Sequence, residues 1–241
     1  MPKNTRRKII RSTVLALVLV MGMACFIYLS IDYQPDAYAL EYLKSDESVT
    51  VRQTDYGWLF DGPGEEDALI FYPGAKVEPA SYAPLLHKLA GEGLDVCLVD
   101  MPLELAILGI NKADNVLNSH SYERWYIGGH SMGGAMAAIY ASDHGDLLEG
   151  VILFAAFPTK PLDDSMTEIL LVGSNDKIIR WNKIEESRQY APSNYIEYVI
   201  GGGNHAQFGS YGAQRDDGVG TITAEDQITQ SVDVIISTIN A

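Results

Sequence analysis

The sequence predicts an α/β protein with a mainly parallel central sheet flanked by helices on both faces. Apolar, β-rich runs of buried-strand length recur along the chain, and from residue 67 onward they alternate with segments of helical periodicity. With 47% hydrophobic and 20% charged residues, the 241-residue chain has enough apolar material for one sizeable core. This composition excludes a disordered, collagenous or disulfide-stapled protein.

The first element expected is an N-terminal membrane segment. Residues 1–11 hold five basic residues and no acidic one, and the run from Ser12 to Ile31 carries no charge. As a helix, that run is long enough to cross the hydrocarbon core of a bilayer, which is about 30 Å thick. Because basic flanks stay on the cytoplasmic side, we expect residues 1–11 to be cytoplasmic, residues 12–31 to be a transmembrane signal anchor, and the remainder to be extracytoplasmic at the cell membrane.

A cleaved signal peptide is the alternative for this segment. Ala37 and Ala39 form a small-residue cleavage pattern just before Leu40, and cleavage there predicts a secreted protein. The uncharged run is longer than the usual apolar core of a signal peptide, which has about 7 to 15 residues, and this length favours the anchor.

Residues 32–47 are predicted to be a polar spacer, and residues 48–241 a single domain. A hairpin is expected near residues 48–62, where two strand-like runs flank turn residues. Further strands are expected at 67–72, 94–100, 124–129, 150–157, 168–173 and 194–200. Helices are expected at 79–93, 131–143 and 181–190, and in the tail, where Thr223 and Asp226 make a capping box.

The charge of the chain excludes one class of partner. The net charge is −15, with 17 basic and 32 acidic residues. Five of the basic residues precede Asp32, which leaves 12 basic against 32 acidic residues and a net charge of −20 beyond them. So acidic a domain repels polyphosphate, and nucleic acid is not expected as a partner. No pair of His, Asp or Glu residues has the spacing of a metal site, and no metal is expected.

A serine follows a predicted strand at the place where the active site is expected, because ligands of parallel sheets bind at the carboxyl ends of the strands. Directly after the strand at 124–129 comes Gly129-x-Ser131-x-Gly133, followed by a helix. A turn this sharp strains the backbone of the serine, and the flanking glycines remove Cβ atoms that would clash. The pattern lacks the lysine of a phosphate loop and the spacing of a dinucleotide site, so we expect Ser131 to be a nucleophile.

A serine hydroxyl needs a base to take its proton, and the base needs a carboxylate to fix its tautomer. His205 follows the strand at 194–200 in a glycine-rich loop and is the predicted base, whereas His130 is expected to point away from the site. Asp176 follows the neighbouring strand and is the predicted carboxylate, with Asp163 or Asp164 as alternatives. The chain order Ser, Asp, His is the order of one hydrolase architecture.

From about residue 67 to residue 240 the chain resembles the α/β-hydrolase fold, in particular its small, lid-poor members of the dienelactone-hydrolase kind. Three short runs carry the resemblance, each after a strand: Gly129-His130-Ser131-Met132-Gly133, Gly173-Ser174-Asn175-Asp176 and Gly203-Asn204-His205. The resemblance implies a serine hydrolase that cleaves a carboxylic ester through an acyl-enzyme and needs no cofactor. Dienelactone hydrolases use a cysteine nucleophile, so dienelactone itself is not the expected substrate.

The oxyanion formed during acyl transfer needs two backbone N–H donors. One is expected from Met132. The resemblance implies that the other comes from the loop after the strand at 67–72, where Ala75 matches the donor and Lys76 remains an alternative. Lys76, Tyr72 and Phe208 are candidate contacts for a small ester substrate.

Related functions remain open at this point. A thioesterase, an amidase or an acyltransferase uses the same three catalytic side chains. A binding module that keeps the fold without catalysis is a further alternative. The short connection between the strands at 150–157 and 168–173 leaves no room for a large cap, so an open site is expected.

Overall fold

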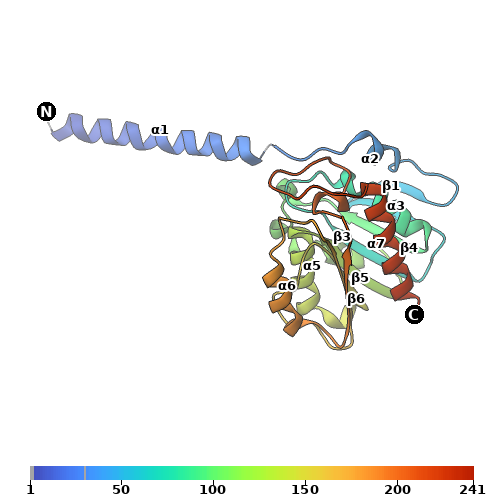
Figure 1. The fold of residues 1–241 in the computed structure, drawn as a ribbon. Helices are drawn as coiled ribbons and strands as arrows, with labels where there is room; N and C mark the ends of the chain where they lie inside the picture. Colours follow the sequence, from blue (N-terminus) through green and yellow to red (C-terminus); the bar gives the residue numbers. More distant parts are fainter. Residues whose placement is uncertain (1–2, 30) are drawn as a thin grey trace. The chain divides into compact units, whose positions relative to one another are not determined.

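The computed structural model describes residues 3–29 and 31–241, and the chain divides into two units, Met1–Asp32 and Tyr33–Ala241. In the first unit, helix α1 (Lys3–Leu29) is continuous (Figure 1). None of the helices in the described part of the chain combines the length and the apolar character that a membrane crossing requires. The structure therefore gives no support to the transmembrane helix predicted at 12–31. Residues 1–2 and 30 of the predicted N-terminal segments lie outside the described residues.

The second unit is built on one eight-stranded sheet with the strand order β1-β2-β4-β3-β5-β6-β7-β8. β1 and β2 form the predicted hairpin, β2 pairs antiparallel with β4, and every other pair is parallel. The α/β class and the mainly parallel sheet are therefore confirmed. The strands are β1 (Thr50–Thr54), β2 (Gly57–Asp61), β3 (Asp67–Tyr72), β4 (Leu94–Val99), β5 (Arg124–His130), β6 (Gly150–Phe154), β7 (Thr167–Gly173) and β8 (Asn194–Ile200).

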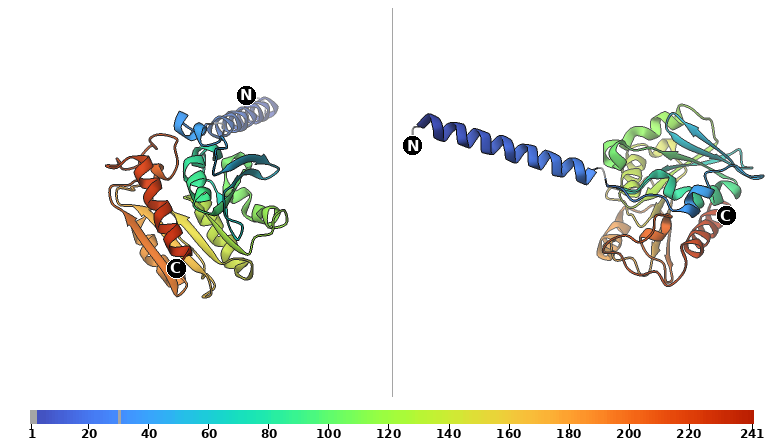
Figure 2. Two further views of the ribbon diagram at one scale, coloured as in Figure 1. Left: turned by 90° about the vertical axis from the view of Figure 1, so that its right-hand side faces the viewer. Right: turned by 90° about the horizontal axis from the view of Figure 1, so that it is seen from above.

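Helices cover both faces of this sheet (Figures 1 and 2). α3 and α7 pack against each other on one face, and α5 and α6 lie on the other. The α-helices of this unit are α2 (Ala37–Glu41), α3 (Ala83–Gly91), α4 (Ala113–Leu117), α5 (Met132–Asp143), α6 (Trp181–Ser187) and α7 (Ala224–Ile239). Short 3₁₀ turns are η1 (Pro79–Tyr82), η2 (Pro102–Glu104), η3 (Ala106–Leu108), η4 (Ile110–Lys112), η5 (Gly145–Leu147), η6 (Arg188–Tyr190) and η7 (Ala206–Phe208).

Two element ends show how local chemistry sets the boundaries. β6 ends at Phe154, earlier than the predicted residue 157, because Ala155 has a φ of 48°, which no strand residue adopts. The capping box predicted for the tail is present at the start of α7: Thr223 Oγ1 accepts the N–H of Asp226, and the Asp226 carboxylate accepts the N–H of Thr223.

Part of the predicted spacer packs on the domain. Tyr33 forms a parallel bridge with Val77, and the N–H of Asp36 donates to the carbonyl oxygen of Ser210. Asp36 also caps α2, in which Ala39 is fully buried. The sequence does not predict that this stretch packs on the domain, because the main-chain hydrogen bonds that hold it require no apolar pattern.

Candidate active site

Ser131 lies in the turn between β5 and α5, and its backbone is strained as predicted. Its φ of 54° and ψ of −119° are rarely adopted by a residue with a side chain. A Cβ atom at Gly129 would lie 2.3 Å from the carbonyl oxygen of Tyr72, and one at Gly133 would lie 2.1 Å from the same oxygen. Only glycine fits these two positions, and the pair of glycines lets the turn hold a half-buried serine at the end of the strand.

His205 and Asp176 form a buried pair at the ends of β8 and β7. The Nδ1 atom of His205 lies 2.7 Å from Oδ2 of Asp176, and both side chains are at most 2% exposed. The other carboxylate oxygen of Asp176 accepts the backbone N–H groups of Ile178 and Ile179 at 2.8 and 2.9 Å. A carboxylate fixed in this way holds the imidazole in one orientation and leaves its Nε2 as the nitrogen that can exchange a proton.

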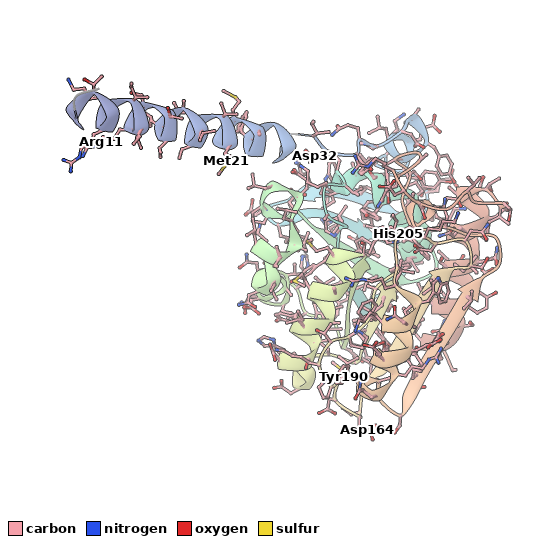
Figure 3. All side chains as sticks on the ribbon, turned by 60° about the vertical axis from the view of Figure 1, so that its left-hand side comes forward. Arg11, Met21, Asp32, Asp164, Tyr190 and His205 are labelled. Atoms are coloured by element: carbon pink, nitrogen blue, oxygen red, sulfur yellow. The ribbon has the colours of Figure 1, made fainter. Side chains whose placement is uncertain are left out.

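The two alternative carboxylates are engaged elsewhere. Asp163 accepts hydrogen bonds from the backbone and the hydroxyl of Ser165, and Asp164 accepts the same two kinds of bond from Ser193. Asp164 lies at the opposite end of the domain from His205 (Figure 3). Of the three aspartates, Asp176 is the one that the fold brings to the imidazole.

The sequence predicts that His130 points away from the site, and this prediction is wrong. Its ring lies against the ring of His205, with 4.5 Å between the centroids, and it is 1% exposed. Its Nδ1 atom lies 2.8 Å from the hydroxyl of Tyr82, with which it forms a hydrogen bond. Burial lowers the pKa of His130 well below its ordinary value, and the neighbouring His205 lowers it further. His130 is therefore neutral, and its ring packs against the ring of His205. Because His130 directly precedes Ser131 in the chain, this contact brings the His205 loop close to the serine turn.

No hydrogen bond joins the Ser131 hydroxyl to His205 among the described residues. Catalytic hydrogen bonds are often long without substrate and shorten when it binds, and the role of Ser131 stays a prediction. The structure brings His205 and Asp176 into contact, and it brings the ring of His130, which precedes Ser131 in the chain, against the ring of His205.

The oxyanion loop, Pro73–Val77, follows β3 and contacts the serine turn. A Cβ atom at Gly74 would lie 2.8 Å from Nδ1 of His130, which shows how closely the loop approaches. The Gly74 N–H donates to the Tyr82 hydroxyl at 3.0 Å, and the Gly74 carbonyl accepts from Val77 at 3.3 Å. These bonds fix the loop on both sides of Ala75.

The same loop distinguishes between the two candidate oxyanion donors. The Lys76 N–H already donates to the carbonyl oxygen of Glu104 at 2.9 Å. In the described part of the chain, the Ala75 N–H has no hydrogen-bond acceptor. Met132 is the first residue of α5, where backbone N–H groups have no partner within the helix. Of the two candidates in this loop, Ala75 is therefore the one whose N–H has no acceptor among the described residues, and Ala75 and Met132 stay the predicted oxyanion donors.

Two of the three predicted substrate contacts are core residues instead. Tyr72 is fully buried, and its hydroxyl donates to the Ile110 carbonyl and accepts the Ala113 N–H. Phe208 is also fully buried and packs on the ring of Phe154. The aromatic residues at these strand ends fill the core beneath the loops, so substrate cannot reach them. Lys76 is half-buried.

Three exposed apolar residues near the oxyanion loop, which we call the apolar rim, are not predicted from the sequence. Leu103, Ile107 and Leu108 are 53 to 55% exposed. Their segment is joined to the loop by the bond between Lys76 and Glu104, and η3 packs against α5. The signal in the sequence is the apolar run at 101–110, which lies in a stretch with no regular period. Among the described residues, no group of His, Cys, Asp and Glu could hold a metal ion.

Comparisons with known proteins agree with this architecture. The model of the alpha/beta hydrolase family matches residues 68–229. Among solved structures, an esterase from Thermogutta terrifontis is 15% identical, with a TM-score of 0.55 over 79% of this chain and 91% of that one. Est1E from Butyrivibrio proteoclasticus is 13% identical, with a TM-score of 0.57 over 81% and 100%.

A putative hydrolase from Agrobacterium vitis is 12% identical, with a TM-score of 0.60 over 79% of this chain and 99% of that one. At such identities these structures establish a shared fold. A search of curated proteins finds no match. Because the family model covers well over half of the sequence, the chain belongs to the alpha/beta hydrolase family.

Proposed function

We propose that this hydrolase cleaves a carboxylic ester through an acyl-enzyme, with Ser131 as nucleophile, His205 as general base and Asp176 as its orienting carboxylate. The buried hydrogen bond between His205 and Asp176, beside the strained serine turn, carries the proposal. The solved structure of the Thermogutta terrifontis esterase, which has the same fold, supports an ester as the substrate class.

The reaction follows from the geometry in two halves. The Ser131 oxygen attacks the ester carbonyl while its proton passes to Nε2 of His205, and Asp176 stabilises the resulting imidazolium. The tetrahedral oxyanion accepts hydrogen bonds from the N–H groups of Met132 and Ala75. Collapse of this intermediate breaks the ester bond, and the proton on His205 goes to the leaving alcohol. Water then attacks the acyl-enzyme with His205 as base, which releases the acid and restores the Ser131 hydroxyl.

The surroundings of the site favour an ester with an apolar portion. Leu103, Ile107 and Leu108 offer exposed apolar surface beside the oxyanion loop. The connection from β6 to β7, residues 155–166, holds no helix, so no cap built from this connection covers the serine. Both features suit a substrate whose acyl or alcohol group lies along an open apolar rim.

A fluorophosphonate probe tests the proposal, because it reacts covalently with an activated serine and mimics the tetrahedral intermediate. We expect the full-length protein to be labelled, and Ser131→Ala to lose all labelling. Ser142→Ala is the matched control, since Ser142 lies near the far end of α5, the helix that follows Ser131, and its hydroxyl donates to the Pro161 carbonyl. Absence of labelling in folded wild-type protein, or equal labelling of Ser131→Ala, contradicts the proposal and favours a non-catalytic binding module.

We further propose that the hydrolase domain acts outside the cytoplasmic membrane. The support is the sequence, in which basic residues precede the uncharged run at 12–31. Protease added to intact cells that express the full chain is then expected to degrade the domain, whereas a cytoplasmic domain is degraded only after lysis. A domain that stays protected in intact cells and is digested after their lysis contradicts this localisation.

A further inference from the structure

We propose that Tyr33 is a positioning residue for the reaction and that it holds the oxyanion loop in its working shape. This inference rests on the proposed function, because it assigns a role in oxyanion stabilisation. Tyr33 lies outside residues 68–229, the region that matches the family model.

The backbone of Tyr33 is paired directly with the loop. Its N–H donates to the carbonyl oxygen of Lys76 at 2.7 Å, and its own carbonyl accepts the N–H of Glu78 at 3.0 Å. These two bonds make the isolated parallel bridge between Tyr33 and Val77. The first of these bonds attaches to Lys76, which directly follows Ala75, and the N–H of Ala75 is the proposed oxyanion donor.

The other contacts of this segment reach the loop that carries the catalytic base. The ring of Tyr33 packs on the ring of Tyr211, with 5.4 Å between centroids, and its hydroxyl accepts the Arg215 N–H at 3.3 Å. The Asp36 N–H donates to the Ser210 carbonyl at 2.9 Å. Residues 33–36, which we call the strap, therefore connect the oxyanion loop with the segment that follows His205.

The conformation of Lys76 explains why the loop needs such a fastening. Lys76 has a φ of 62°, in the left-handed region that is unfavourable for a residue with a side chain. Its N–H is held by Glu104 and its carbonyl by Tyr33. Loss of the second bond removes one of the backbone contacts that hold Lys76 in this conformation. A change of φ at Lys76 rotates the Ala75–Lys76 peptide and, through Ala75, shifts the Gly74–Ala75 peptide that carries the Ala75 N–H.

Substitutions of Tyr33 in the full-length chain separate these contacts. Tyr33→Phe removes the hydroxyl alone, Tyr33→Ala also removes the ring, and Tyr33→Pro in addition removes the N–H that holds Lys76. We expect Tyr33→Phe to lose the least rate and Tyr33→Pro to lower kcat for an ester by about 10-fold or more below Tyr33→Ala, with KM changed less than about 2-fold. Complete loss of one oxyanion donor costs about 10²- to 10³-fold, which sets the upper limit.

Tyr38→Ala is the control for general damage to this segment. Tyr38 is a half-buried tyrosine on α2, and its hydroxyl donates to the hydroxyl of Tyr42 and lies near Glu225, away from the oxyanion loop. We expect it to keep the wild-type kcat. Thermal unfolding of all variants identifies any whose loss of rate reflects unfolded protein.

Thionoesters provide a readout that a merely structural role would not move. Sulfur is larger and a weaker hydrogen-bond acceptor than oxygen, so a thionoester gains less from the oxyanion donors than the matching oxoester. We expect Tyr33→Pro to lose more rate on the oxoester, so that the ratio of the two kcat/KM values falls about 10-fold. The pH profile is expected to stay unchanged, because the pair His205 and Asp176 is untouched.

The outcomes distinguish this inference from the proposed function. If the wild type hydrolyses esters but Tyr33→Pro keeps its kcat, or loses rate equally on both substrates, the role of Tyr33 is overturned and the proposed function stands. If the wild type hydrolyses no ester, the proposed function itself fails. A fall of the ratio in Tyr33→Pro alone supports the strap.

Discussion

Replacing His205 with glutamine is expected to lower kcat/KM for ester hydrolysis by about 10⁴-fold. Glutamine is close in size to histidine and suits a side chain that is only 2% exposed, but it cannot take the proton of Ser131. The nucleophile is then a neutral hydroxyl, and attack on the carbonyl is left to weak catalysis by the oxyanion donors. Initial rates with a chromogenic ester, measured from pH 6 to 9, give the size of the loss.

Asp176→Asn tests the same proposed catalytic group, Ser131, His205 and Asp176, through the carboxylate that orients His205. The side-chain oxygen of asparagine can still accept the N–H groups of Ile178 and Ile179, but its NH₂ group then faces Nδ1 of His205. That donor forces the imidazole into the tautomer with its proton on Nε2, which cannot accept the proton of Ser131. We expect a loss of about 10⁴-fold. The double variant with His205→Gln should be little worse than His205→Gln alone, because the residues act as a unit.

The alternative aspartates serve as controls for this prediction. The side chains of Asp163 and Asp164 accept hydrogen bonds from Ser165 and Ser193, and neither bonds to the imidazole of His205 among the described residues. Asp163→Asn and Asp164→Asn are therefore expected to keep wild-type rates. A loss larger in either of these than in Asp176→Asn, or a fully active His205→Gln, would refute the assignment.

The sheet could be predicted from the sequence because each buried strand is a short apolar run between turn residues. β3 and β4 are fully buried along their length, and a strand buried on both faces leaves such a run. The strained serine turn could be predicted for a related reason. The close approach of Tyr72 leaves no room for side chains at Gly129 and Gly133, and that requirement is written in the sequence as glycine.

The rest depends on contacts between distant segments, which leave no local pattern. The orientation of His130 is set by Tyr82, 48 positions away in the chain, and by the ring of His205. The strap at 33–36 is held largely by main-chain hydrogen bonds, which any residue except proline can donate. Its sequence therefore looks like a polar spacer. Tyr72 and Phe208 carry aromatic rings near strand ends, and only the packed structure shows that both rings face the core.

The second large effect concerns stability, and it comes from the buried carboxyl group of Glu168. Glu168 lies on β7 opposite Tyr195 of β8 and is 1% exposed. Neither of its carboxyl oxygens has a hydrogen-bond partner among the described residues. Burial and, to a smaller extent, the nearby charge of Glu197 together raise its pKa from 4.5 to about 8. Glu168 is therefore protonated in the folded protein at neutral pH.

This raised pKa makes the free energy of unfolding depend on pH. Below pH 4.5 the group is protonated in both states and has no such effect. Between pH 4.5 and 8 the unfolded chain releases the proton while the folded chain keeps it, so the stability falls as the pH rises. The full difference corresponds to about 5 kcal/mol, which is a large part of the stability of a typical domain.

Glu168→Gln removes the titration while keeping the shape of the side chain. We expect the variant to be more stable than the wild type at pH 9 by up to about 5 kcal/mol, less the cost of a buried amide, and the gain to shrink toward zero at pH 5. Urea unfolding at pH 5, 7 and 9 measures the difference, and Glu149→Gln, an exposed position before β6, is the control with no expected change. Parallel pH dependence in the wild type and Glu168→Gln would show that the folded protein does not hold this proton, since a group that titrates alike in both states cannot make stability depend on pH.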